Sequence, residues 1–351
     1  MGIVCKNHVF TLQTKHSAYQ MKEEGGFLFH NYYGPVIGDM DMSYLVRPLD
    51  RGLSEQPQEI MDRGFSLDTR LLEYPSYGTG DYRDYCLHAA YGDGSQVTDL
   101  RFVSYEIEEG KYALEGLPAM YQGEEKAETL EITLEDKYKN LQVVLYYGVF
   151  ENLDVITRAC KIVNKGEDKV RLLRAYSMAL DFDHKDLDFL HFYGRHAMER
   201  KMERSPLQHG FQGVESRRGY SSHQQNPFAV LCKPDATEEY GWCYGASFVY
   251  SGNFSIQAEV SQADTTRLTV GIQDTQFEFH LEPGECFTTP EVILSFSDKG
   301  LGQLSRNYHK AIRNNVCRGK YKTARRPVLI NNWEATYFDF TPEKLVAIAK
   351  D

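Results

Sequence analysis

The segments "TLEITLED" (129–136), "NLQVVLYYGVF" (140–150) and "LDVITRACKIVN" (153–164) follow one another with turns of only two or three residues between them. Each segment alternates apolar with polar side chains, which is typical of a β-strand with one buried face. Short turns rich in Asn, Glu and Lys between such runs are typical of antiparallel meanders. We therefore expect three consecutive antiparallel strands here.

The same alternation continues through most of the chain. It recurs in "KVRLLRAYSMALDFD" (169–183) and in four later segments: 241–262, 266–273, 275–287 and 291–297. More than a dozen strands without intervening helices favour a mainly β protein built from two large packed antiparallel sheets. We assign residues 1–298 to this domain.

Composition narrows the functional classes. The 351 residues are 42% hydrophobic and include 24 Tyr and 19 Phe, which suits half-buried sheet surfaces. The net charge of −11 argues against nucleic-acid binding, which requires an excess of Lys and Arg. We see no secretion signal and no run of about 20 apolar residues that could cross a membrane.

Seven scattered cysteines, an odd number without metal-binding spacing, are typical of reduced thiols rather than of a disulfide framework. The cytoplasm is therefore the simplest location. The cysteines are Cys5, Cys86, Cys160, Cys232, Cys243, Cys286 and Cys317.

Helical periodicity begins only after Gly300. Five apolar residues recur there at three- and four-residue spacing and predict an amphipathic helix; they are Leu301, Leu304, Tyr308, Ile312 and Val316. We assign 299–325 to a helical linker that ends in the basic "RGKYKTARR" (318–326).

Residues 326–351 read as one strand and one helix. The β-branched run at 328–330 predicts a fully buried strand, and Thr341-Pro342 predicts a capped helix start. A single parallel strand cannot bury both faces, because its neighbours come through crossover connections. We therefore expect this unit to begin a domain that continues beyond Asp351. Without its barrel partners, we expect it to be poorly ordered or to cover the sheet non-natively.

Several segments carry a closer resemblance. "LINNWEATYFDFTPEKL" (329–345), "FSLDTRLLEYPSYGTGDYR" (65–83), "ITRACKIVN" (156–164), "SSHQQNPF" (221–228) and "GWCYGASFVYSGNF" (241–254) resemble, in order, glycoside hydrolase family 36 α-galactosidases. The resemblance covers essentially the whole chain. One departure is "YGRHAMER" (193–200), which lacks the Trp of the family version.

The resemblance implies a large antiparallel β-supersandwich, a helical linker, and the first β–α unit of a (β/α)₈ catalytic barrel. It implies the N-terminal part of a retaining α-galactosidase acting on oligosaccharides such as melibiose or raffinose, without cofactor or metal. A retaining glycosidase needs two carboxylates ~5–5.5 Å apart, and barrel sites draw on several strands. We expect both carboxylates beyond residue 351, so the chain by itself should be inactive.

Candidate substrate-binding residues follow the predicted strand, where barrels place functional side chains. The resemblance implies that Trp333 helps to wall the galactose pocket. Glu334, Tyr337 and Asp339 are further candidates, although charged and hydroxyl groups in such loops more often face solvent or cap helices.

A long Pro- and Gly-interrupted stretch at 47–83 is the second candidate region, since long irregular loops are often functional. In the family, such a loop reaches the pocket of a neighbouring subunit within a homo-oligomer, often a tetramer. The resemblance implies this role for 50–66, with Asp50, Arg51, Asp62 and Arg63; a surface loop of the same chain is the alternative.

Weaker patterns remain. The acids of "LDFDHKDLDF" (180–189) lack the Gly and terminal Glu of a calcium loop and favour a solvated turn. The polar side chains of "SSHQQNPF" could either bind sugar hydroxyls or form a hydrogen-bonded turn. The glycines of "YPSYGTGDYR" lack a strand-to-helix context and favour a tight turn at an interface over a phosphate loop.

Two alternatives to the glycosidase stay open. A complete sugar epimerase or mutarotase would use a His acid and a carboxylate base on the sheet, with His191, His196 or His209 as candidates; residues 326–351 would then have no use. A non-catalytic carbohydrate-binding or assembly module is the other alternative.

Overall fold

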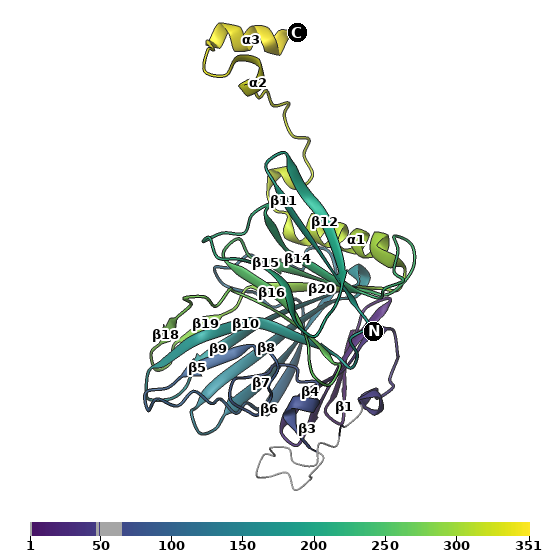
Figure 1. The fold of residues 1–351 in the computed structure, drawn as a ribbon, viewed down its shortest axis with the longest axis vertical. Coiled ribbons are helices and arrows are strands. Elements are labelled where there is room, and N and C mark those ends of the chain that lie inside the picture. Colours follow the sequence, from purple (N-terminus) through teal and green to yellow (C-terminus); the bar gives the residue numbers. More distant parts are fainter. Residues whose placement is uncertain (1, 47–48, 50–64) are drawn as a thin grey trace. The chain divides into compact units, whose positions relative to one another are not determined.

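Antiparallel pairing organises nearly all of the chain. The computed structural model describes residues 2–46, 49 and 65–351, and the strands among them form three antiparallel sheets (Figure 1). The mainly β, antiparallel prediction is confirmed, but the strands divide into three sheets where we expected two.

The smallest sheet is an N-terminal meander in the order β1-β2-β3-β4. Its strands are β1 (Gly2–Lys6), β2 (Val9–Gln13), β3 (Ser17–Glu24) and β4 (Phe27–Pro35). Short 3₁₀ turns follow at Ser43–Leu45 and Leu67–Thr69.

The largest sheet has the order β12-β11-β14-β15-β20-β9-β8-β7-β6, with β19 also paired to β9. The meander expected at 129–164 consists of β7, β8 and β9, which lie next to the edge strand β6. The 3₁₀ turn η3 connects β8 to β9. The strands are β6 (Arg101–Glu109), β7 (Ala127–Asp136), β8 (Leu141–Phe150), β9 (Val155–Asn164), β11 (Asp188–Arg195), β12 (Met198–Pro206), β14 (Gln225–Cys232), β15 (Cys243–Val249), β19 (Cys286–Thr288) and β20 (Glu291–Ser297), with η3 at Glu151–Leu153.

The third sheet has the order β13-β16-β17-β10-β18, and β5 also pairs with β10. Its strands are β5 (Leu87–Ala90), β10 (Val170–Phe182), β13 (Gly210–Ser216), β16 (Phe254–Val260), β17 (Thr266–Gly271) and β18 (Phe279–Leu281). One continuous apolar cluster draws buried side chains from all three sheets, so they share a core.

A buried ionic network joins the sheets inside this core. Arg158 of β9 lies 2.8 Å from the Glu73 carboxylate and donates to the carbonyl of Ala179 on β10 at 2.5 Å. The hydroxyls of Tyr19 on β3 and Tyr147 on β8 donate to Glu73 at 2.6 and 2.8 Å. Burial by itself raises the pKa of Glu73, but Arg158 and His30 outweigh it, so the carboxylate stays ionised.

A second buried network lies around Arg267 of β17. Its guanidinium binds both carboxylate oxygens of Asp181 at 2.7 Å and one of Asp81 at 2.8 Å. Arg83 also binds Asp81, at 2.9 Å. The segment around 73–84, which has little regular structure, is therefore anchored to β17 and β10 by charge-assisted hydrogen bonds.

Helix α1 (Gly300–Ala311) packs on the largest sheet and continues into a π-helical turn at Ile312–Val316. The Tyr308 hydroxyl donates to the Ile293 carbonyl at 3.0 Å, and Asn307 Nδ2 donates to Ser295 Oγ at 3.1 Å. The predicted helix is confirmed, but Ile312 lies outside its buried face, because Asn307 and Ala311 occupy that face instead.

The chain divides into two compact units, Met1–Val316 and Cys317–Asp351. The second contains a 3₁₀ turn (Lys320–Lys322), α2 (Trp333–Thr336) and α3 (Pro342–Lys350). Thr341 caps α3 as expected, accepting from the Lys344 amide at 3.3 Å. The division into domains at 298 and 325 stays a prediction.

The apolar run at 328–330 forms no strand among the described residues, so the pairing into the main sheet that would have contradicted our expectation for 326–351 is not seen there. These residues pair with no strand in the described parts of the chain, and Val328, Leu329 and Ile330 are 98%, 87% and 44% exposed. Strand-forming residues alone do not make a strand, because the backbone groups need a neighbouring strand to bond.

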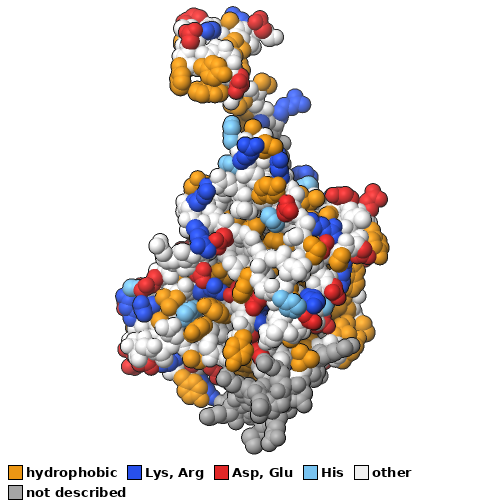
Figure 2. Space-filling view, viewed as in Figure 1, with side chains coloured by type: hydrophobic (Ala, Val, Ile, Leu, Met, Phe, Trp, Pro, Cys, Tyr) orange, Lys and Arg blue, Asp and Glu red, His pale blue; other side chains and the backbone are white. Residues whose placement is uncertain are grey.

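Surface charge is mixed. On the face shown in Figure 2, Lys and Arg side chains are interspersed with Asp and Glu. None of the helices in the described ranges has the length and apolar character needed to cross a membrane.

Loss of the Arg158 guanidinium should destabilise the fold. Arg158→Met leaves Glu73 buried without its cation, and we expect the free energy of unfolding to fall by ~3–5 kcal/mol. Arg158→Met/Glu73→Gln should recover part of that loss. Urea unfolding followed by far-UV circular dichroism measures both.

The matched control is Lys169→Met. Lys169 lies 2.8 Å from Glu282, but both side chains are about half exposed, so we expect a loss below ~1 kcal/mol. Equal losses for the Arg158 and Lys169 variants would contradict a structural role for the network.

Buried Lys111 should make stability depend on pH. Its ammonium lies 2.6 Å from Glu291, yet burial lowers its pKa to about 8 despite the attraction of that carboxylate. The unfolded chain, with a Lys pKa near ~10.4, binds more protons above pH 8, so this contribution to stability increases as pH rises to about 10.4.

We expect wild type to gain ~3 kcal/mol relative to Lys111→Met/Glu291→Gln between about pH 7 and about pH 11. The double variant removes both charges, so the titration of other groups cancels in the comparison. If the difference in unfolding free energy between wild type and the double variant stays constant with pH, the lowered pKa of Lys111 is disproved.

Candidate functional site

Trp333 and Tyr337 lie together in the C-terminal unit. Trp333 opens α2, where its amide donates to Asn331 Oδ1 at 3.0 Å. Its ring contacts the rings of Tyr337 and Phe338 edge-to-face, with centroids 5.5 and 5.2 Å apart. The indole is half exposed, so these residues form an aromatic surface that a sugar ring could cover.

The turn after α2 presents Tyr337 in an unusual backbone conformation. Tyr337 has φ +49°, in the left-handed region that non-glycine residues seldom adopt. Asn332 Nδ2 donates to Thr336 Oγ1 at 2.8 Å and so fixes the preceding turn. Such strain often accompanies functional positions. Glu334 is exposed, and Asp339 lies 3.4 Å from Lys344 Nζ at the surface.

The second candidate region, 50–66, falls mainly outside the residues that the structure describes. Asp50, Arg51, Asp62 and Arg63 lie outside the described residues. Their expected contact with a neighbouring subunit stays a prediction.

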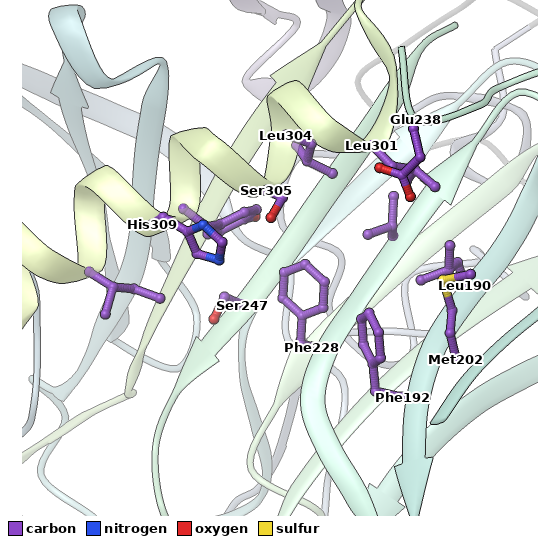
Figure 3. A pocket seen from close by; sticks show the side chains of 13 residues that line it. Leu190, Phe192, Met202, Phe228, Glu238, Ser247, Leu301, Leu304, Ser305 and His309 are labelled. Atoms are coloured by element: carbon purple, nitrogen blue, oxygen red, sulfur yellow. The ribbon is translucent and has the colours of Figure 1, made fainter. Parts of the chain in front are cut away.

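An apolar pocket of about 420 Å³ lies between α1 and strands of the largest sheet. Figure 3 shows Leu304, Ser305 and His309 on the helix side, with Phe192 and Phe228 on the strands beneath. Glu238 is the single acid that lines it, so the pocket cannot supply the two carboxylates of a retaining glycosidase. The lining residues are Leu190, Phe192, Met202, Phe228, Val230, Glu238, Ser247, Leu301, Leu304, Ser305, Tyr308, His309 and Ile312.

A more polar pocket of about 380 Å³ lies on the N-terminal sheet and contains Asp39 and Asp41. Lys6 lies 2.5 Å from Asp39, and Lys22 lies 3.6 Å from Asp41. Burial alone raises the pKa of Asp41, but hydrogen bonds from Ser43 and the charge of Lys22 bring it below its usual value. A general acid needs a raised pKa, so Asp41 is unsuited to that role.

The carboxylates of the ionic networks are also unsuited to glycoside cleavage. Asp81 and Asp181 share Arg267, and Glu73 is held by Arg158. All three side chains are buried, so a sugar cannot reach them. They are structural groups.

The solvated turn expected at 180–189 is correct for Asp183 and Asp186, which are exposed, but wrong for Asp181 and Asp188, which are buried in ion pairs. Asp181 binds Arg267, and Asp188 binds Arg204 Nε at 2.7 Å. No group of three or more His, Cys, Asp or Glu side chains that could hold a metal occurs among the residues that the structure describes.

The histidines proposed for an epimerase, His191, His196 and His209, lie outside the two pockets described above. His209 lies 2.9 Å from Asp264 at the surface, and His196 lies in the exposed turn between β11 and β12. Burial lowers the pKa of His191, with Glu203 opposing it.

In the segment 221–228, Ser222 and Gln225 form an isolated bridge, as a hydrogen-bonded turn would. Gln225 Oε1 and Asn226 Oδ1 are buried without a hydrogen-bond partner in the described chain. A role of the segment 221–228 in sugar binding stays a prediction.

Sequence reasoning missed the α1 pocket and both ionic networks. The sequence contained a signal for the pocket, since Leu301 and Ile312 are apolar residues of the helical segment that lie outside its buried face. It contained little signal for the ionic networks, because Glu73 and Arg158 are 85 residues apart in the sequence.

Two sequence families match the chain, one after the other. The glycosyl hydrolase family 36 N-terminal domain matches residues 26–282, and the melibiase family matches residues 286–351. The bifunctional alpha-galactosidase/sucrose kinase AgaSK of Mediterraneibacter gnavus is 50% identical over 345 residues, which cover 98% of this chain and 37% of that protein. Alpha-galactosidase AgaA of Geobacillus stearothermophilus is 47% identical, covering 97% and 47%.

Solved structures agree over the same length. The galactosidase domain of AgaSK superposes with a TM-score of 0.95 at 49% identity, covering 99% of this chain and 49% of that one. A variant of Geobacillus stearothermophilus AgaA in complex with raffinose superposes with a TM-score of 0.94 at 47% identity, covering 97% and 48%. The chain spans less than half the length of the relatives named here.

Removal of the Trp333 indole should leave the stability of the β unit unchanged. The ring contacts given for Trp333 are all within its own unit, so Trp333→Ala should change the free energy of unfolding of 2–316 by less than ~0.5 kcal/mol. Far-UV circular dichroism during urea unfolding monitors the β unit.

Tyr308→Ala provides the contrast. Tyr308 is buried and bonded to the Ile293 carbonyl, so we expect a loss of ~3–5 kcal/mol. A loss of that size for Trp333→Ala would show instead that the indole packs structurally.

Proposed function

This chain belongs to glycosyl hydrolase family 36, and from that membership we propose that it is the N-terminal part of an α-galactosidase. The consecutive matches at 26–282 and 286–351 carry the proposal. The proposed reaction is hydrolysis of terminal α-linked galactose from oligosaccharides. Raffinose and stachyose are the substrates of choice for a first test, since they are bound in related structures.

We propose that the β unit is a scaffold rather than the reacting centre. Its core acids are paired with buried cations, Glu73, Asp81 and Asp181 with arginines and Glu291 with Lys111. The two pockets described above lack a suitable pair of carboxylates. The nucleophile and the acid/base, ~5–5.5 Å apart in a retaining enzyme, are then supplied by residues outside this sequence.

Within that enzyme, Trp333 would stack on the apolar face of galactose, with Tyr337 beside it. The exposed edge-to-face pair supports this role, because an aromatic surface left uncovered can accept a ligand. Glu334 would lie in the same wall as a polar contact to a hydroxyl.

We further propose a homo-oligomer, with a tetramer as the candidate state. In it, the loop 50–66 extends toward the substrate pocket of a neighbouring subunit and contributes Asp50, Arg51, Asp62 and Arg63. The family resemblance of this loop supports it, and light scattering with size exclusion tests it. A cytoplasmic location is proposed from seven cysteines without a disulfide among them.

The activity test compares two proteins. We expect the 351-residue chain to leave p-nitrophenyl α-galactoside intact, and the protein made from the whole reading frame to release p-nitrophenol. The β-galactoside serves as the control substrate. Turnover by the pure 351-residue chain would falsify the scaffold role.

In the complete enzyme, Trp333→Ala should raise KM for raffinose about tenfold, equivalent to ~1.4 kcal/mol of lost binding. Tyr138→Ala is the matched control, because Tyr138 is an exposed aromatic on the β7–β8 turn. Equal KM values for the two variants would rule out a substrate contact for Trp333.

A further inference from the structure

Two cysteines face each other across neighbouring strands of the largest sheet. Cys232 ends β14 and Cys243 begins β15, and the antiparallel register pairs them directly. The next pair along, Lys233 and Trp242, is joined by a backbone hydrogen bond of 3.0 Å. Because hydrogen-bonded and non-hydrogen-bonded pairs alternate, Cys232 and Cys243 form a non-hydrogen-bonded pair, in which side chains approach most closely.

That geometry matches the requirement for a disulfide. Non-hydrogen-bonded pairs have Cα atoms ~4.5 Å apart, within the range of about 4.4–6.8 Å that disulfides span. Both thiols face the same apolar cluster beneath α1. The strands would therefore need little adjustment to be linked.

The two thiols are buried, but their location gives a route for access. Both lie at strand ends beside the turn 233–242, and strand ends open more readily than strand centres. Arg204 covers this turn, donating to the carbonyls of Lys233, Pro234 and Ala236 at 2.7–2.9 Å.

The environment distinguishes the two thiols. The hydrogen bond from Cys243 lowers the pKa of Cys232, and the charge of Arg204 adds to this against the effect of burial. The same hydrogen bond, together with burial, raises the pKa of Cys243. Since the thiolate is the reactive form, we assign the first attack to Cys232.

We propose that Cys232 and Cys243 form a redox-modification site that a peroxide converts to a cross-strand disulfide. The Cys232 thiolate attacks one peroxide oxygen, the O–O bond breaks, and a sulfenic acid forms as water leaves after proton uptake. Cys243 sulfur then attacks the Cys232 sulfur and expels a second water. Overall, two thiols and one hydrogen peroxide give one disulfide and two waters.

The disulfide would stabilise the point where α1 begins. The amides of Gly300, Leu301 and Gly302 donate to the carbonyls of Gly241, Thr237 and Glu238, all in the turn between the two cysteines. Linking the ends of this turn restricts its opening. Oxidation therefore fixes the attachment of α1 to the sheet.

Peptide mapping tests the proposal on the whole chain. The folded protein is treated with hydrogen peroxide, denatured, alkylated without reduction, and digested with trypsin. Residues 219–267 form one tryptic peptide with no other cysteine, because Pro234 blocks cleavage after Lys233. We expect this peptide to lose both alkylation sites and two hydrogens, while buried Cys160 stays alkylated.

Two variants test the order of the steps. In Cys243→Ser the sulfenic acid has no partner, so we expect a dimedone adduct on Cys232. In Cys232→Ser we expect Cys243 to remain alkylatable and free of dimedone. Circular dichroism verifies that both variants are folded. If either variant is not, the peptide map of the wild-type chain still tests whether the disulfide forms.

Two results would overturn the proposal. One is full alkylation of both cysteines at a peroxide concentration that oxidises exposed Cys286. The other is a disulfide that links either of them to a different cysteine.

Discussion

Arg158 and Glu73 meet in the middle of the β unit, and the three sheets are organised around them. The guanidinium comes from the largest sheet, the tyrosine hydroxyls that share Glu73 come from the largest and the smallest, and a carbonyl of the third accepts from the arginine. An uncompensated charge at that depth would be costly, so each partner requires the others. The network thereby joins all three sheets at one point of the core.

The same physics limits what the β unit can do chemically. Acid/base catalysis needs carboxyl groups that can exchange protons with a substrate. In this core, burial alone raises the pKa of enclosed Glu73 and Asp81, but arginines hold it below the usual value. The division resembles that of many enzymes in which function lies in a site added to a stable fold. In this chain the exposed aromatic pair at Trp333 and Tyr337 is a candidate contact, and the proposed role of the sheets is to support such a site.

Local patterns predicted local structure well. The meander at 129–164 and the cap at Thr341 could be predicted because alternation and capping depend on neighbours in sequence. No strand forms at 328–330, although its apolar, β-branched residues are typical of strands, because no partner strand for it lies in the described chain. The third sheet and the Cys232–Cys243 pairing depend on strand order, which a single sequence does not reveal. The contact of Asp50, Arg51, Asp62 and Arg63 with a neighbouring subunit remains a prediction.

The two tryptophans are divided between the two compact units. Trp242 lies in the β unit, edge-to-face with Phe296, and Trp333 lies in the C-terminal unit. Each unit consequently contains one tryptophan, whose emission can be excited selectively over that of the tyrosines. Emission spectra of single-tryptophan forms can report on the halves independently, without any attached dye.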